Sequence, residues 1–150
     1  MPDIQVAIAD TNALYRLFTP KDPGHSAHRE ALAQTGHLVV SPMVLTELDH
    51  LLTSRVGTRA AINALDFITG QAEARRFEIP DTAPHLRTAM AVMRGYVDAD
   101  GGAGVGLVDA MNVALAAAFR TADIFTTDSH FRMMRPLTGQ PAFRLLPDDF

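Results

Sequence analysis

The chain has 150 residues, about the usual length of one domain, so we expect residues 1–150 to fold as a single domain. It contains no cysteine, which excludes disulfides, thiolate zinc sites and cysteine nucleophiles and leaves oxygen or imidazole as the only metal ligands. The formal net charge of −4 argues against a broad basic surface. Of the 13 lysine and arginine residues, however, all except Lys21 are arginines, whose planar guanidinium suits phosphate.

Apolar runs of strand length alternate with longer segments of helical period, a pattern typical of α/β proteins with a parallel sheet. Strands are predicted at residues 6–9, 38–40, 77–79 and 124–127, with a fifth at 142–146 on the sheet edge. Helices are predicted at 11–18, 25–35, 42–52, 58–74, 82–97 and 107–120. We therefore expect an α/β fold with a central, mostly parallel sheet of four to five strands flanked by helices.

Some local signals refine these boundaries. Gly36 is placed to end the second helix in the left-handed conformation, and Ser41-Pro42 is a good start for the third. Leu86, Met90, Met93 and Val97 predict one apolar face of the helix 82–97, and the methionines at 90, 93 and 111 are interpreted as core residues. Residues 98–106 are rich in glycine and predict a loop.

No stretch approaches the ~20 apolar residues needed to span a bilayer. The N-terminal sequence MPDIQVAIAD shows no basic segment ahead of a long apolar run, so no secretory signal is expected. We therefore expect a cytoplasmic protein.

Two acidic residues follow predicted buried strands. Asp10 comes directly after the run 6–9, and Asp128 after the run 124–127. Because functional groups of open α/β sheets gather at the carboxyl ends of the strands, these two side chains are candidates for a shared site.

Two further acids stand in apolar surroundings. Asp109 lies in the first turn of an alanine-rich helix that is apolar almost all round, and Glu47 lies on the rim of the apolar face of the helix that follows the second strand. A buried carboxylate is costly unless it is paired, hydrogen-bonded or bound to metal, so such a conflict between pattern and charge indicates a functional site.

Each acid alone has a simpler interpretation. Asp10 and Asp128 are plausible helix N-caps, Asp109 is a first-turn acid favoured by the helix dipole, and Glu47 is an ordinary solvated helix residue. The four acids in one architecture favour a common site over four coincidences.

The ordered set of motifs resembles the PIN-domain nucleases, and within them the VapC-type toxins of bacterial toxin–antitoxin pairs. The resemblance covers most of residues 6–131 and rests on Ile8-Ala9-Asp10-Thr11-Asn12, Ser41-Pro42-Met43-Val44-Leu45-Thr46-Glu47-Leu48, Tyr96 with Gly106-Leu107-Val108-Asp109-Ala110, and Thr126-Thr127-Asp128 with Phe131. It implies a three-layer α/β sandwich, an endoribonuclease activity, an RNA substrate and a VapB-type antitoxin as partner.

Clustered carboxylates without thiolates favour Mg²⁺, with Mn²⁺ as an alternative. As a hypothesis, Asp10 and Asp109 bind the first ion, and Glu47 and Asp128 complete the site directly or through water. The ion would polarise a phosphoryl oxygen and activate a water molecule, with a second ion as an option. Thr126, on the same strand face as Asp128, and Asn12 are supporting candidates.

The expected partners follow from the same interpretation. An acidic pocket invites a cationic side chain of the antitoxin. The apolar residues Leu14, Leu17 and Leu51 are expected to contribute to that interface, to a homodimer or to the core.

Other functions also place acidic residues at the ends of strands. A phosphoacceptor receiver domain also has acids at strand ends, but it needs a lysine late in the chain, and Lys21 is the only one. Two further alternatives stay open: a PIN-like binding module without catalysis and a housekeeping RNA-processing nuclease. An adjacent antitoxin gene would favour the toxin.

The Glu-x-x-His at Glu47 and His50 lacks the second copy that a di-iron site requires, and His50 is interpreted as a surface or partly buried residue.

Overall fold

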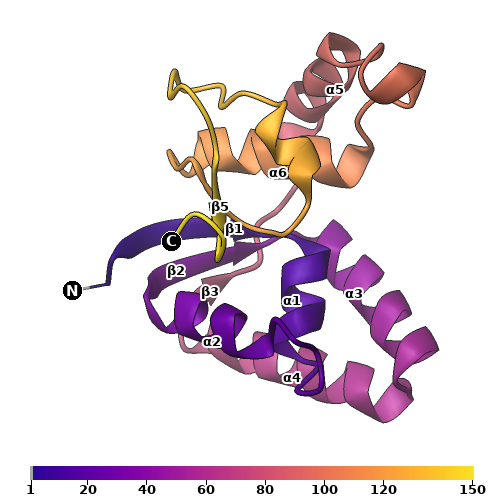
Figure 1. Ribbon diagram of the computed structural model, residues 1–150, viewed down its shortest axis with the longest axis vertical. Helices are drawn as coiled ribbons and strands as arrows, with labels where there is room; N and C mark the ends of the chain where they lie inside the picture. The colour runs from indigo at the N-terminus through magenta and orange to yellow at the C-terminus, as the bar shows by residue number, and fades with distance from the viewer. Residues whose placement is uncertain (1) are drawn as a thin grey trace.

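Five parallel strands form the central sheet of the protein, whose residues 2–150 are described by a computed structural model (Figure 1). The strands are β1 (Ile4–Ala9), β2 (Thr35–Val40), β3 (Phe77–Glu78), β4 (Asp123–Phe125) and β5 (Arg144–Leu146). They lie in the order β3-β2-β1-β4-β5, with Ile8 opposite Val39 on one side and Ile124 on the other. The predicted edge strand is confirmed as β5.

Helices cover both faces of this sheet and make three layers (Figure 1). They are α1 (Thr11–Leu17), α2 (His25–Ala33), α3 (Pro42–Arg55), α4 (Thr58–Glu73), α5 (Leu86–Gly95) and α6 (Leu107–Ala118), with short 3₁₀ turns at Ala83–His85, Asp100–Gly102 and Ser129–Arg132. The first four helices pack on one face, and α5 and α6 pack on the other.

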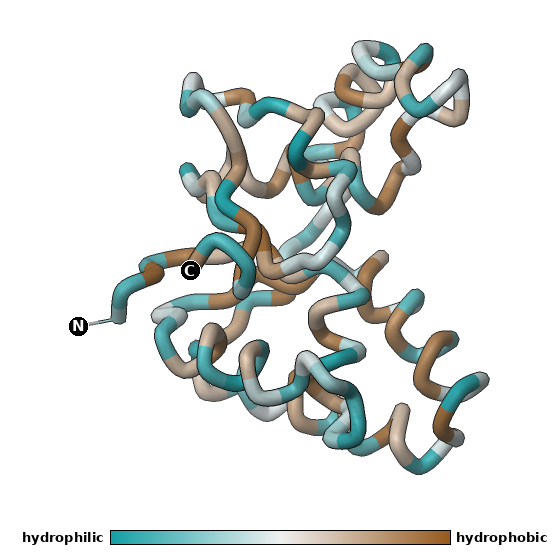
Figure 2. Tube along the Cα trace, viewed as in Figure 1, coloured by the Kyte–Doolittle hydropathy of each residue, from teal (hydrophilic) through white to brown (hydrophobic). Residues whose placement is uncertain are grey.

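The strands are apolar on both sides because both sides are covered. Along β1, Ala7 and Ala9 join the core beneath α1 to α4, whereas Ile8 joins the core beneath α5 and α6. Side chains of a strand alternate between faces, so a continuous apolar run suits a sheet buried on both sides. Figure 2 shows the hydrophobic colour running through the strands at the centre.

The prediction for Gly36 is wrong, because this residue lies inside β2 and not at a helix end. Helix α2 ends at Ala33, two residues earlier than expected, and β2 begins at Thr35. A Cβ at Gly36 would lie 3.1 Å from the carbonyl oxygen of Gln5 on β1. The glycine therefore permits a close approach of two strands.

The predicted apolar face of residues 82–97 is also wrong in large part. Leu86 and Val97 are 39% and 61% exposed, and Met90, expected in the core, is 38% exposed. The buried side chains of α5 are instead the small residues Ala89 and Val92. The methionine interpretation is confirmed for Met111, which is fully buried, and for Met93 and Met111 as members of the core around α6.

The strand order separates this fold from the receiver domain considered above. Receiver domains share the order 2-1-3-4-5, whereas here β1 lies between β2 and β4. Among residues 2–150, no helix combines the length and the apolar composition needed to cross a membrane.

Candidate metal centre

The candidate site lies where the sheet changes direction. From β1 the chain proceeds outward to β2 and β3 and then returns through α5 and α6 to β4 on the other side of β1. Crevices at the carboxyl ends of the strands at such a switch point are the usual ligand sites of open α/β sheets. The backbone amide of Asp10 donates to the carbonyl oxygen of Phe125 at 2.9 Å and fixes the ends of β1 and β4 beside each other.

Three of the four predicted acids meet there. Asp10, Asp109 and Asp128 each offer a carboxylate oxygen, and these oxygens all lie within 4.8 Å of one another. Asp10 is 4% exposed, and the other two are half-buried. We call these residues the acidic trio.

Glu47 shares the hollow of the acidic trio but is not part of it. Both line a hollow of about 690 Å³, yet Glu47 is exposed and no oxygen of it belongs to the close cluster. The hydroxyl of Thr11 donates to Glu47 Oε1 at 2.6 Å and ties α3 to the start of α1. The structure thus places Glu47 at the rim of the hollow.

Hydrogen bonds hold Asp10 in one orientation. Its Oδ1 accepts from the amide of Thr11 at 2.9 Å, which is the N-cap interaction of α1, and its Oδ2 accepts from the hydroxyl of Thr126 at 2.8 Å. Asn12 donates to the same Oδ2 at 3.5 Å and accepts from the amide of Thr127 at 2.9 Å. Both predicted supporting residues therefore contact the site.

The reason given for placing Thr126 beside Asp128 is wrong. Strand β4 ends at Phe125, so neither residue lies on a strand face. Instead the chain turns, and the amide of Asp128 donates to the hydroxyl of Thr126 at 3.0 Å. One hydroxyl therefore positions Asp128 through its backbone and Asp10 through its carboxylate.

Burial and the repulsion of neighbouring carboxylates shift Asp10 and Asp109 toward the protonated state. Burial is the main cause that raises the pKa of Asp10 to about 6, with the hydrogen bonds from Thr126 and Thr11 acting in the opposite direction. Burial likewise raises the pKa of Asp109 to about 7, and the charges of Asp10, Asp128 and Glu47 add to it. A bound cation would relieve both costs.

His130 is a neighbour of the site that the sequence interpretation missed. Its Nδ1 lies 2.8 Å from Asp128 Oδ1, which also accepts from the His130 amide at 2.9 Å. On its other side Nε2 lies 3.2 Å from Asp100 of the glycine-rich loop. The charge of Asp128 raises the pKa of His130. The only sequence signal was its position two residues after a candidate acid.

His50 lies at the surface, as interpreted from the sequence, and it lines the hollow together with Thr46 and Leu51. His50 follows Glu47 by three residues on α3, so the two exposed side chains lie on the same side of the helix. The hollow therefore continues from the carboxylates along α3.

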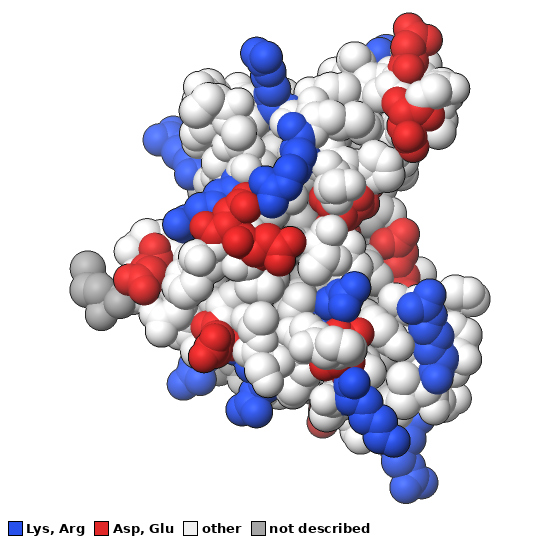
Figure 3. All heavy atoms as spheres, in the orientation of Figure 1, with Lys and Arg blue, Asp and Glu red and all other residues white. Residues whose placement is uncertain are grey.

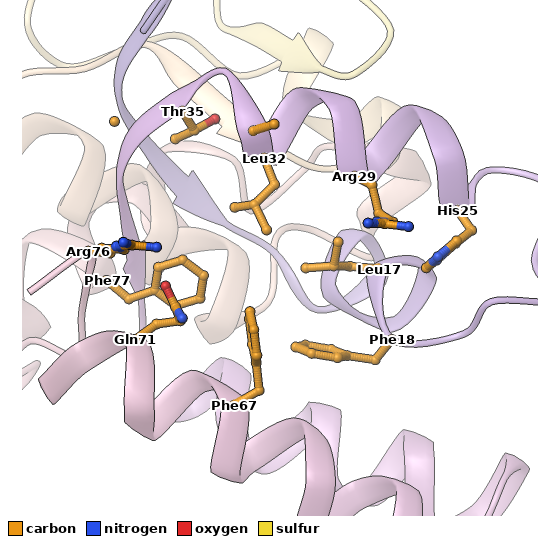
Figure 4. Close-up of a pocket in the computed structure, with 12 residues that line it drawn as sticks. Leu17, Phe18, His25, Arg29, Leu32, Thr35, Phe67, Gln71, Arg76 and Phe77 are labelled. Carbon is orange, nitrogen blue, oxygen red and sulfur yellow. The ribbon is translucent and has the colours of Figure 1, made fainter. Parts of the chain in front are cut away.

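A second hollow, of about 900 Å³, lies between α1, α2, α4 and the starts of β2 and β3. Figure 4 shows the rings of Phe18, Phe67 and Phe77 beside it, with Arg29 and Arg76 at its borders. No acidic residue lines it, so it does not provide a carboxylate metal site.

The PIN domain family matches residues 7–135 of the chain. The chain is also similar to "Ribonuclease VapC26" of Mycobacterium tuberculosis, with 36% identity over 135 residues that cover 88% of this chain and 94% of the relative.

Solved structures share the fold at lower identity. A crystal structure of VapC20 of Mycobacterium tuberculosis, described as a Sarcin-Ricin loop cleaving toxin, aligns with a TM-score of 0.68 and 19% identity over 83% of this chain and 91% of that one. VapBC2 of Rickettsia felis, bound to a fragment of promoter DNA, aligns with a TM-score of 0.62 and 19% identity over 89% and 96%. A toxin–antitoxin complex of Klebsiella pneumoniae aligns with a TM-score of 0.58 and 20% identity over 90% and 92%.

Proposed function

This chain belongs to the PIN-domain family, and from that premise we propose that it is a Mg²⁺- or Mn²⁺-dependent endoribonuclease whose residues 1–150 form one nuclease domain. The observation that carries the proposal is the acidic trio, with oxygens within 4.8 Å at the switch point of the sheet. The relative named as a ribonuclease, 36% identical over most of both chains, supports the same activity.

The residues of the site fit a hard divalent cation. Carboxylates are the ligands that Mg²⁺ and Mn²⁺ prefer, and Mg²⁺ usually takes only one or two of them directly. Asp10 and Asp109 would hold the ion, with Asp128 beside them and Glu47 acting from the rim. The raised pKa values of Asp10 and Asp109 are what acids prepared for a cation show in its absence.

The residues of the site have different proposed roles in hydrolysis. A bound ion would polarise a phosphoryl oxygen and lower the pKa of an attacking water. Thr126 and Asn12 keep Asp10 oriented, and His130 holds Asp128 through two contacts to its Oδ1. Glu47, which is exposed and accepts a hydrogen bond from Thr11, would accept a proton from water at the rim.

The test is to incubate the purified protein with RNA in EDTA, Mg²⁺ or Mn²⁺. We expect cleavage only with metal, lost in D109N and retained in D49N, because Asp49 is an exposed acid of α3 outside the hollow. Cleavage in EDTA, or cleavage by D109N at the wild-type rate, would refute the proposed chemistry.

We further propose that the protein is the cytoplasmic toxin of a VapBC-type pair and that an antitoxin restrains it. The structural neighbours that contain both partners support this role. The hollow of the acidic trio would receive an arginine or lysine of the antitoxin in the place of the metal. The aromatic hollow in Figure 4, bordered by Arg29 and Arg76, suits an apolar segment of the same partner that carries acidic residues.

Two of the apolar residues expected at the partner interface are buried in the core. Leu14 is fully buried and Leu17 is 8% exposed, so both belong to the core, although Leu17 also lines the aromatic hollow. A homodimer would more readily use the exposed apolar residues of α5, Leu86 and Met90. Co-expression with the neighbouring open reading frame, followed by size-exclusion chromatography and an RNA assay, tests both partners.

A failure to co-purify a partner, with normal growth of cells that express the active protein alone, would instead favour a housekeeping RNA-processing nuclease. Absence of metal-dependent cleavage would favour a PIN-like binding module.

A further inference from the structure

We propose that the surface of α1 and α3 beyond the hollow of the acidic trio is a binding site for a single strand of RNA, and that Arg55, held against Tyr15, contacts a phosphate there. We call these two residues the Arg55–Tyr15 pair. This inference rests on the proposed ribonuclease function and adds a substrate-binding site outside the acidic trio.

The pair continues the hollow along two packed helices. Thr11 of α1 and Leu51 of α3 both line the hollow. Tyr15 and Arg55 follow these residues by four positions, which places each on the same side of its helix, one turn further on. The Arg55 guanidinium carbon lies 5.4 Å from the centre of the Tyr15 ring, so the two helices meet there as well. His50 lies between the carboxylates and the pair.

Arg55 retains its hydrogen-bonding capacity for a ligand. It is exposed, and among residues 2–150 no carboxylate lies within ion-pair distance of it. By contrast, Arg16, Arg132 and Arg144 pair with Asp22, Asp149 and Asp123. The half-buried ring of Tyr15 packs on the core and holds the guanidinium in place, which lowers the entropy lost when it binds.

The position of the Arg55–Tyr15 pair fits an RNA strand that extends away from the acidic trio. Arg55 is eight residues after Glu47, which corresponds to about 12 Å along the helix, so it contacts a phosphate beyond the one that is cleaved. Asp49 precedes Arg55 by six positions and therefore faces another side of α3. Figure 3 shows basic side chains over the region where α3 and α4 lie in Figure 1.

The test measures binding of a fluorescent 20-nucleotide single-stranded RNA of mixed sequence by anisotropy, in Mg²⁺ and at several salt concentrations. The parent is D109N, which leaves the RNA uncleaved. We expect R55A in this parent to weaken binding about 5- to 10-fold and to reduce the slope of log K against log salt by about 0.7, the value for one phosphate contact on a single strand. R55K should restore the slope, and Y15A should weaken binding while the slope stays unchanged.

The matched control is R87A, which removes an exposed arginine of α5 on the other face of the sheet and should change neither quantity. Thermal unfolding verifies that each variant is folded. An unchanged slope in R55A, or no RNA binding by the parent, overturns the inference; loss of antitoxin binding in R55A with RNA binding unchanged would assign the surface to the protein partner. Cleavage by the wild-type enzyme is measured separately, so failure of the proposed function is distinguished from failure of this site.

Discussion

The hydroxyl of Thr126 donates to Oδ2 of Asp10 across 2.8 Å and joins two residues that are 116 positions apart. The same oxygen accepts from the amide of Asp128 at 3.0 Å. One buried hydroxyl therefore positions two members of the acidic trio. The hydrogen bond lowers the pKa of Asp10 against the larger effect of burial.

Replacing Thr126 by valine should raise the pKa of Asp10 above its value of about 6, because the hydroxyl that stabilises the carboxylate is lost. We expect RNA cleavage at pH 7 to fall about 10-fold and to recover in part at higher pH. T126S keeps the hydroxyl and should retain most activity. The pH–rate profile and carboxyl NMR titration measure the change; identical profiles for T126V and wild type would contradict it.

Replacing Asp109 by asparagine should stabilise the metal-free protein in a pH-dependent way. The pKa of Asp109 in the folded state, about 7, exceeds its ordinary value of 3.8. The folded state therefore binds more protons than the unfolded state, and the stability of wild type falls as the pH rises between these values. The gain from D109N should be close to zero at pH 4 and about 1 to 3 kcal/mol at pH 8. Urea unfolding in EDTA measures it, with D49N as control. A gain that does not vary with pH would argue against this explanation.

Glu47 should matter more for cleavage than for metal binding, because it lies outside the acidic trio. Added Mg²⁺ should raise the melting temperature of wild type, and D109N and D10N should lose this shift. We expect E47Q to keep most of the shift and to lose cleavage at least 10-fold. The experiment is a thermal unfolding series in Mg²⁺ with RNA cleavage measured alongside. Complete loss of the shift in E47Q would place Glu47 among the direct ligands.

Asn112 should lower the free energy of unfolding relative to an apolar residue of similar size. It is fully buried in α6, and among residues 2–150 neither its amide nitrogen nor its oxygen has a hydrogen-bond partner. Leucine has a similar size and no polar atom to leave unpaired, so N112L should stabilise the protein by about 1 to 3 kcal/mol. Urea unfolding checks this value. A loss of stability in N112L would contradict this prediction.

The sequence was most informative where local pattern and tertiary environment agree. Buried parallel strands are apolar on both sides, so the strands that end before Asp10 and Asp128 could be recognised and their common edge inferred. The conflict between an apolar helix and Asp109 was equally visible, because burial of that helix follows from its composition.

Features that depend on contacts between distant segments could not be predicted in this way. Whether a glycine ends a helix or permits close approach of strands, as Gly36 does, depends on the neighbouring strand. The small residues Ala89 and Val92 face the core because α6 packs closely on α5, although Leu86 and Met90 are more hydrophobic. Helical periodicity identifies a hydrophobic face, and the neighbouring element decides which face is covered.

The order of the acids along the chain has a consequence for synthesis in the cell. Asp10 and Glu47 leave the ribosome early with β1 to β3, whereas Asp109 and Asp128 come with α6 and the turn after β4. Strand β4 must pair with β1 before the trio can form, and this contact closes a loop of more than a hundred residues. A nascent or truncated chain that lacks the last third therefore has no complete centre. Under the proposed function, the protein would not cleave RNA during this interval of translation, and an antitoxin made at the same time would reach it first.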